Sequence, residues 1–145
     1  AHKTVLKYNG STIAVLGNGL DICYPGENRK LRELLLENGA FISEFIPGTK
    51  PDAVNFPKRN RIISGLSKGV LIIEAGKKSG AIITALNALD QNREVFALPG
   101  QTDSTKSVGT NRLIQQGARL VMTVDDILSE FQHQSPLNKW NYYPN

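Results

Sequence analysis

Five short apolar segments alternate along the chain with longer segments in which apolar residues recur every three or four positions. The short segments cover residues 12–16, 40–43, 70–73, 95–98 and 120–123. Their nearly continuous apolar character is typical of strands buried on both faces of a sheet. The longer segments predict helices over residues 28–38, 59–67, 81–91, 110–116 and 125–131, and residues 1–6 have the character of a helix end. This alternation predicts an α/β fold with a mostly parallel, doubly wound sheet.

Small and polar residues stand where the predicted helices begin and end. Gly39 follows the helix at 28–38 and is expected at the left-handed position just beyond its last residue. Ser79 precedes the helix at 81–91, where a hydroxyl accepts a hydrogen bond from a free backbone N–H. The helix at 110–116 is expected to end before Gly117.

Length and composition are those of a single globular domain. The chain has 145 residues, of which 40% are hydrophobic and 21% charged, and no run approaches the ~20 apolar residues of a membrane span. One cysteine, Cys23, excludes an internal disulfide and favours a reducing compartment such as the cytoplasm. The net charge of +4 leans only mildly toward polyanionic partners. We expect a domain over residues 1–131 and a linker or tail over residues 132–145.

A basic segment provides the first candidate site. Residues 56–66 read Phe-Pro-Lys-Arg-Asn-Arg-Ile-Ile-Ser-Gly-Leu. Pro57 suits the first turn of a helix, so Lys58, Arg59 and Arg61 are predicted close to a helix N-terminus, where cations oppose the helix dipole. This placement favours an anion such as phosphate at that end. A solvated charged turn before a buried helix remains the alternative.

Two glycine-containing loops resemble nucleotide-binding motifs only in part. Gly17-Asn18-Gly19 follows a predicted strand, but Ile22 stands where a dinucleotide-binding loop has glycine, and a tight turn explains the same residues. The loop at residues 76–80 lacks the first glycine of a P-loop, so ATP hydrolysis is not expected. Ser79 and Gly80, with the hydroxyl of Thr84, could still bind one phosphate, whether or not Ser79 also caps the helix.

Residues for catalysis are sparse. Neither histidine has a partner evident from the sequence, Cys23 has no nearby histidine, and no metal-binding spacing occurs. Carboxylates fall near predicted strand ends, where α/β proteins form their sites, but without a nucleophile, base or metal beside them. They are Asp21, Glu44, Glu74 and Asp103. We therefore expect no enzyme activity, cofactor or metal.

The order and spacing of these motifs resemble the DNA-processing protein A family, DprA or Smf. The resemblance covers residues 1–131 and rests on five segments. They are residues 12–21 with Tyr24-Pro25, residues 56–66, Glu74-Ala75 leading to residues 79–85, Phe96-Ala97-Leu98-Pro99-Gly100, and residues 109–114 with Gly117-Ala118. It implies a Rossmann-like domain. Family members have an earlier strand, a Gly-Ser-Arg loop and a helix, so we expect a partial domain that lacks the first strand-helix region.

The resemblance implies binding of single-stranded DNA without sequence preference, and transfer of that DNA to the RecA recombinase in natural transformation. Phe56 is expected to stack on a base, and three loops are expected to converge on one sheet edge and contact phosphates. The DNA-binding residues predicted in this way are Gly17, Asn18, Gly19, Phe56, Lys58, Arg59, Asn60, Arg61, Ser79, Gly80, Thr84, Asn111 and Arg112.

The resemblance also implies a homodimer formed through the last helices. Leu113, Ile114, Ile127 and Leu128 are the predicted interface, with ordinary core packing as the alternative. Two other functions are considered: a Rossmann-like enzyme that cleaves nucleoside monophosphates, and a nucleotide-sensing module. Such enzymes have a Pro-Gly-Gly-x-Gly-Thr loop, whereas residues 74–80 here read Glu-Ala-Gly-Lys-Lys-Ser-Gly.

Overall fold

A computed structural model of the chain describes residues 1–132. The predicted linker or tail at residues 132–145, which includes His133, therefore lies outside the described residues except for Gln132. The chain divides into two compact units, Ala1–Ser67 and the residues from Lys68 onward. Each unit is described by itself.

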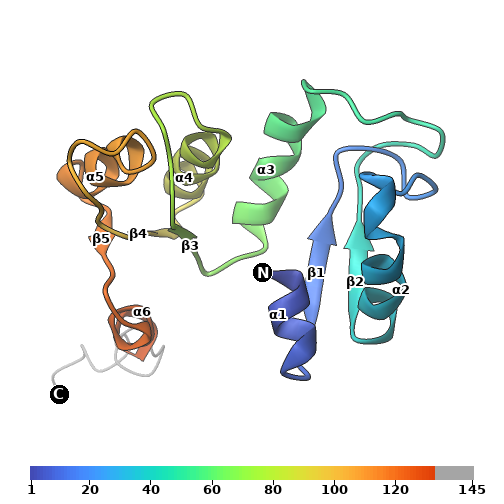
Figure 1. Cartoon of the computed structure of the whole chain (residues 1–145), viewed down its shortest axis with the longest axis horizontal. Coiled ribbons are helices and arrows are strands. Elements are labelled where there is room, and N and C mark those ends of the chain that lie inside the picture. The colour runs from blue at the N-terminus through green and yellow to red at the C-terminus, as the bar shows by residue number, and fades with distance from the viewer. Residues whose placement is uncertain (133–145) are drawn as a thin grey trace, which may run out of the picture. The chain divides into compact units, whose positions relative to one another are not determined.

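The first unit is built on two parallel strands. Its elements are α1 (His2–Lys7), β1 (Thr12–Val15), a 3-10 turn (Gly26–Asn28), α2 (Arg29–Glu37), β2 (Gly39–Ile42) and α3 (Asn55–Gly65). β1 pairs in parallel with β2, with Thr12 opposite Gly39 and Val15 opposite Ile42 (Figure 1). α2 packs on this pair and buries Leu35, which is 1% exposed. The loop after β1 therefore leaves from the carboxyl end of a two-stranded parallel sheet.

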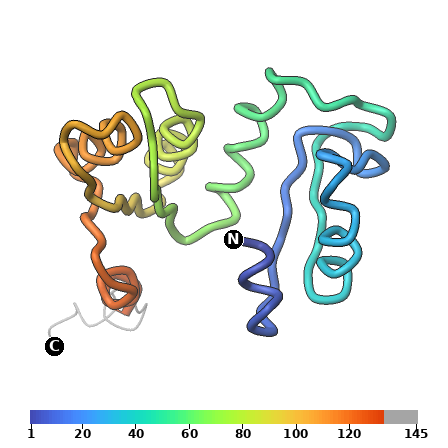
Figure 2. The backbone as a smooth tube through the Cα atoms, viewed as in Figure 1, coloured from blue at the N-terminus to red at the C-terminus, as the bar shows by residue number. Residues whose placement is uncertain are grey.

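The second unit is a three-stranded parallel sheet with helices on both faces. Its elements are β3 (Gly69–Ile72), α4 (Gly80–Asp90), β4 (Glu94–Ala97), α5 (Val108–Gln115), β5 (Arg119–Leu120) and α6 (Val124–Gln132), with the strand order β3-β4-β5. The chain path is followed most easily in Figure 2.

Alternation along β4 explains how this second sheet is covered. Val95 and Ala97 join the core under α4 and α5, which contains Ala85, Ala88 and Leu113. Phe96 points to the opposite face, where its ring lies edge-on to that of Phe131 in α6, with centroids 5.8 Å apart. The predicted α/β fold with parallel strands is thus confirmed, with the strands distributed over two small sheets, one per unit.

Three local predictions are wrong, each for a physical reason. α3 begins at Asn55 rather than at residue 59, because Asp52 starts the turn earlier: its carboxylate accepts from Val54 N and its carbonyl oxygen from Asn55 N, both at 3.0 Å. Gly39 does not follow α2 in a left-handed conformation: it begins β2, where a side chain would collide with the carbonyl oxygen of Thr12. β5 ends at Leu120 because the N–H groups of Met122 and Thr123 donate to the carboxylate of Asp126, at 2.9 and 2.8 Å, instead of extending the ladder.

The other helices match their predictions closely. The hydroxyl of Ser79 accepts a hydrogen bond from Ala81 N at 3.3 Å, which confirms the predicted cap of α4. Gly117 follows α5 with a φ of 102°, a left-handed conformation that glycine adopts without strain. Within residues 1–132, no helix combines the length and apolar character that a bilayer crossing requires.

Candidate nucleic-acid interface

The loop that follows β1 is held together by buried polar contacts. Asn18 is 2% exposed, and its side-chain nitrogen donates to the carbonyl oxygens of Gly19 and Ile22, both at 2.9 Å. Its own carbonyl accepts from the Ser43 hydroxyl at 2.7 Å, while Gly19 N donates to Thr49 O at 2.9 Å. The side-chain amide of Asn18 is therefore used to hold the loop together.

An aromatic side chain lies against this loop. A Cβ added to Gly17 would stand 3.0 Å from Cδ1 of Phe56, so the glycine allows the ring to pack on the loop backbone. The Tyr24 ring centroid is 6.2 Å from that of Phe56, and the guanidinium carbon of Arg59 is 5.6 Å from the Phe56 centroid. Gly17, Phe56 and Arg59, all members of the predicted DNA-binding set, thus lie together, and Tyr24 joins them.

The charge of Arg59 is partly buried among neutral partners. Its guanidinium donates to the carbonyl oxygen of Val15, and its Nε donates to Oδ1 of Asn60 at 3.2 Å. Burial lowers the pKa of Arg59, although the group stays protonated at neutral pH. Within the described part of the chain it forms no ion pair with a carboxylate. A half-desolvated cation of this kind gains from an anion that approaches it.

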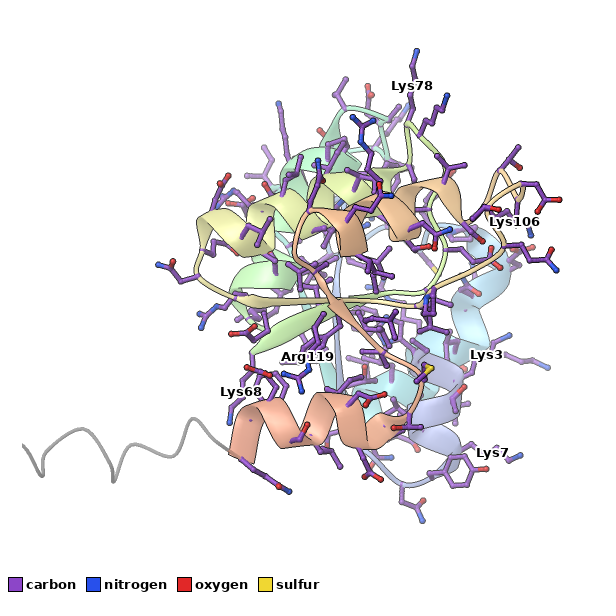
Figure 3. The ribbon with its side chains drawn as sticks, turned by 90° about the vertical axis from the view of Figure 1, so that its left-hand side faces the viewer. Lys3, Lys7, Lys68, Lys78, Lys106 and Arg119 are labelled. Atoms are coloured by element: carbon purple, nitrogen blue, oxygen red, sulfur yellow. The ribbon has the colours of Figure 1, made fainter. Side chains whose placement is uncertain are left out.

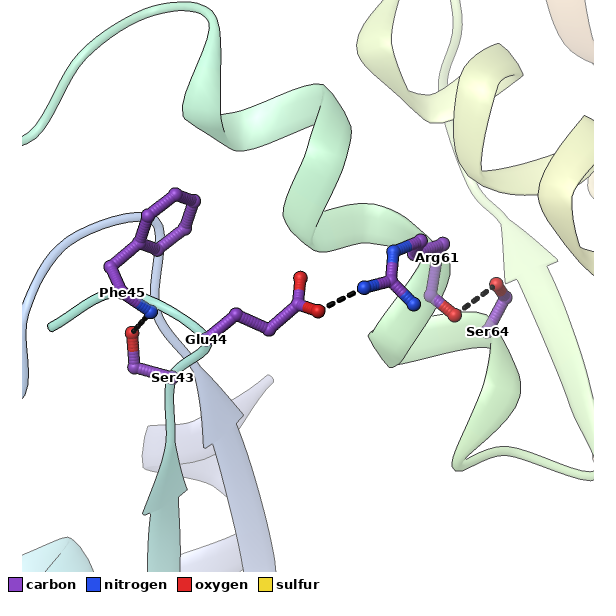
Figure 4. A network of polar contacts seen from close by, with 5 residues as sticks. All are labelled: Ser43, Glu44, Phe45, Arg61 and Ser64. Atoms are coloured by element: carbon purple, nitrogen blue, oxygen red, sulfur yellow. Dashed lines mark hydrogen bonds and ion pairs between the residues drawn. The ribbon is translucent and has the colours of Figure 1, made fainter.

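The remaining cations of α3 are exposed and further from the helix start than predicted. Because α3 begins at Asn55, Arg61 lies well inside the helix, so the interpretation that all three cations crowd the N-terminus is wrong. Pro57 remains in the first turn, where its missing N–H costs no hydrogen bond. Arg61 forms an ion pair with Glu44 (Figure 4), and both side chains are exposed. Such surface pairs are worth little, so phosphate can compete for the guanidinium.

In the second unit, the predicted residues gather at the start of α4. Ser79 caps the helix, and the Thr84 hydroxyl donates to Gly80 O at 3.3 Å. Nothing lies within 4 Å of a Cβ added to Gly80, so the backbone there is open to a ligand. Lys78 extends from the preceding loop in Figure 3. Phosphate binding at this helix start stays a prediction.

The two predicted residues of α5 have different roles. Asn111 accepts from Gly100 N at 3.1 Å and donates to Gly100 O at 2.9 Å, so its amide is used to hold the turn after β4. Arg112 is exposed and lines, with Lys77, a groove of about 220 Å³ between α4 and α5. The convergence of this region with the loop after β1 also stays a prediction, because the two lie in separate units.

The predicted dimer residues divide between core and surface. Leu113 is 4% exposed and belongs to the core of the second unit, and Ile114 packs against that core. Core packing thus accounts for both residues of α5. Ile127 is half-buried, and Leu128 is 49% exposed on α6. Leu128 is the member of the set that offers most surface to a partner.

Three of the candidate carboxylates are engaged in structural contacts. Asp21 accepts from Gly48 N with both oxygens at 2.9 Å, Glu44 pairs with Arg61, and Glu74 lies 3.6 Å from the Lys106 ammonium. Within residues 1–132, no group of three or more side chains that could hold a metal ion comes together.

Sequence reasoning missed two residues of the loop region. Arg32 donates to the carbonyl oxygens of Leu20 and Ile22, the latter at 3.1 Å. No sequence signal links this residue of α2 to the loop. Tyr24 belongs to the Tyr-Pro pair that carried part of the resemblance, but the sequence did not reveal its contact with Phe56.

Comparison with known proteins identifies the family. The family model for DNA recombination-mediator protein A matches residues 1–132. The chain belongs to this family. It is 53% identical over 133 residues to Protein Smf of Escherichia coli strain K12, which covers 91% of this chain and 36% of that protein. The resemblance drawn from the motifs is therefore confirmed.

Two solved structures of DNA processing protein A share the fold. The X-ray structure from Streptococcus pneumoniae superposes with a TM-score of 0.82 at 43% identity, over 90% of this chain and 46% of that one. The Helicobacter pylori protein, whose structure concerns a unique single-stranded DNA binding mode, gives a TM-score of 0.75 at 23% identity, over 91% of this chain and 70% of that one. The chain spans less than half of the E. coli and streptococcal relatives.

Proposed function

We propose that this chain binds single-stranded DNA without sequence preference, as part of DNA processing in recombination. The observation that carries the proposal is the half-buried, charged guanidinium of Arg59, which lies beside the Phe56 ring next to the loop after β1. Cations that meet phosphates, together with a ring that stacks on bases, are the two parts of a sequence-tolerant single-strand site. Membership of the DNA recombination-mediator family supports this reading.

Each part of the proposed site has a distinct task. Lys58, Arg59 and Arg61 contact phosphates, and Phe56 stacks on a base. Gly17 and Gly19 are buried against Phe56 and the backbone of Ile46, so we assign this loop the positioning of the Phe56 ring. In the second unit, the start of α4 and Arg112 supply further phosphate contacts. Because Asn18, Asn60 and Asn111 already use their amides within the protein, we assign them the positioning of these groups.

We propose that binding is not accompanied by catalysis. The incomplete P-loop at residues 76–80 and the lack of a nucleophile–base pair evident from the sequence support this. Incubation with ATP and with nucleoside monophosphates, followed by chromatography, tests the proposal. Turnover that survives purification and disappears in Glu74→Ala would support a nucleotide-cleaving enzyme instead.

The cellular partners follow from the family resemblance. We propose that the bound DNA is protected and transferred to the RecA recombinase in natural transformation, that the protein acts as a homodimer, and that it works in the cytoplasm. The exposed Leu128 on α6 supports a contact with a second copy. The single cysteine agrees with a reducing compartment.

The binding experiment uses three variants, of which two should weaken binding and one should tighten it. Arg61→Ala should weaken binding of a labelled single-stranded oligonucleotide and reduce the slope of log affinity against log salt by about 0.7, the value for one lost phosphate contact. Glu44→Gln should tighten binding, because it removes a negative charge and the ion-pair partner of Arg61. Arg59→Ala should weaken binding more than Arg61→Ala, since its charge is less hydrated.

Lys7→Ala is the matched control. Lys7 is an exposed cation at the end of α1, which precedes β1, whereas the proposed site follows β1. We expect it to change neither affinity nor salt slope beyond the small effect of one unit of net charge. Unchanged binding and an unchanged salt slope in the Arg59→Ala, Arg61→Ala double variant would refute the proposed site.

A further inference from the structure

We propose that Tyr24, supported by the Phe56 ring, stacks on a nucleobase of the bound strand beside Arg59. The inference rests on the proposed single-stranded DNA binding and adds to it a residue whose role is the recognition of a base. Three observations carry it: the exposure of the Tyr24 ring, the fixed position of its loop, and the cavity beside it.

The Tyr24 ring is anchored on one side and open on the other. Its centroid lies 6.2 Å from that of Phe56, with the ring planes inclined at 40°, while 55% of the residue is exposed. Phe56 in turn has the Arg59 guanidinium 5.6 Å from its centroid. An aromatic face is thus available next to a cation whose partners within residues 1–132 are neutral groups. A nucleotide satisfies both features, because its base offers a π-face and its phosphate a charge.

The segment that carries Tyr24 is fixed before any ligand binds. The carbonyl oxygen of Ile22, two residues earlier, accepts from the Asn18 side chain at 2.9 Å and from Arg32 at 3.1 Å. Arg32 is itself held by the Phe41 ring, with 5.1 Å between its guanidinium carbon and the ring centroid. A ring on a preformed loop loses little conformational entropy when it stacks. We therefore expect Tyr24 to contribute fully to binding.

A cavity of about 190 Å³ lies beside the ring and limits what can enter. Its lining includes Tyr24, Arg59, Arg32 and Phe41, with aliphatic walls from β1 and α2, and does not include Phe56. Phe56 therefore supports the Tyr24 ring from outside the cavity. It is smaller than the roughly 300 Å³ at which pockets for drug-sized ligands begin. One planar base suits this space, whereas a complete nucleotide must leave its sugar and phosphate outside. Arg59 borders the cavity and can meet that phosphate.

The test measures binding of a labelled single-stranded oligonucleotide by fluorescence anisotropy. Tyr24→Ala should weaken binding about 5- to 150-fold, the range that one base stack supplies, and leave the salt slope unchanged because no phosphate contact is lost. Tyr24→Phe should bind within about twofold of the wild type, because the ring and not the hydroxyl is used. Tyr8→Ala is the matched control. Tyr8 is 75% exposed at the end of α1 and precedes β1, whereas Tyr24 follows β1.

Abasic oligonucleotides identify the base contact itself. When the abasic position faces Tyr24, the wild type should lose affinity and Tyr24→Ala should lose no more. Equal losses for both proteins at every abasic position would overturn the inference, as would wild-type affinity in Tyr24→Ala. A wild type that binds no oligonucleotide would overturn the proposed function as well, so the two failures are distinguishable. A mononucleotide that binds the wild type but not Tyr24→Ala, with strand binding unaltered, would make this a nucleotide site and refute the strand contact.

Discussion

Replacement of Asn18 tests whether the loop after β1 is set by its buried amide. Asn18→Ala removes the donor that meets the carbonyl oxygens of Gly19 and Ile22. Each neutral hydrogen bond contributes about 0.5–1.5 kcal/mol, so the loss of two predicts a decrease of about 1–3 kcal/mol in the free energy of unfolding. Because Tyr24 and Gly17 flank the same loop, DNA affinity should decrease in parallel.

Asn18→Asp is the sharper variant because it has the same shape. The introduced carboxylate has no proton to donate to the two carbonyl oxygens that it faces. These oxygens favour its protonated form, so we expect its pKa in the folded protein to exceed the ordinary value of about 3.9. With a raised pKa in the folded state, the loss in free energy of unfolding caused by Asn18→Asp is smallest below about pH 3.9 and grows as the pH rises through the raised pKa. At pH 7, this variant should therefore be less stable than Asn18→Ala.

Urea denaturation followed by far-UV circular dichroism measures both effects. With a slope of about 2 kcal/mol per M urea, a loss of about 2 kcal/mol moves the midpoint by about 1 M. Hydrogen exchange at residues 17–24 locates the change in the loop. A midpoint shift below about 0.2 M in Asn18→Ala, together with an Asn18→Asp variant that shows the same stability at pH 7 and pH 4.5, would refute the role assigned to the amide.

Three further predictions concern the second unit. Ser79→Ala should lower the stability of that unit by about 1 kcal/mol, because the α4 cap is lost, whereas Ser79→Asp should retain it; thermal denaturation compares the two. Hydrogen bonds from Thr123 N and Met122 N lower the pKa of Asp126, so its contribution to stability is complete above the ordinary value of 3.8 and is lost as the pH falls through the lowered pKa. In Asp126→Asn, the protection of α6 against hydrogen exchange should change less than in the wild type as the pH falls. Leu128→Lys should yield a folded monomer by light scattering, and a monomeric wild type would contradict the proposed dimer.

Periodicity and motifs were sufficient to predict the elements and the family. Apolar runs and helical spacing placed the strands and α-helices of residues 1–132 within a few residues, since these patterns reflect burial that each segment carries in its own sequence. The cap at Ser79 and the turn at Gly117 were also predictable, because both depend on residues next to them in the chain. The motifs in residues 12–21 and 56–66 identified the family that comparison confirmed.

Tertiary contacts decided how each candidate residue is used. The sequence placed Asn18, Asn111 and Arg112 alike among DNA contacts, yet the two amides turn inward to carbonyl groups while Arg112 stays exposed. The orientation of a polar side chain depends on the backbone groups that other segments leave unsatisfied, such as Gly100 beside Asn111. The contact between Tyr24 and Phe56 depends likewise on packing between segments distant in sequence, so local pattern predicts the elements while the folded chain determines which side chains remain free to bind.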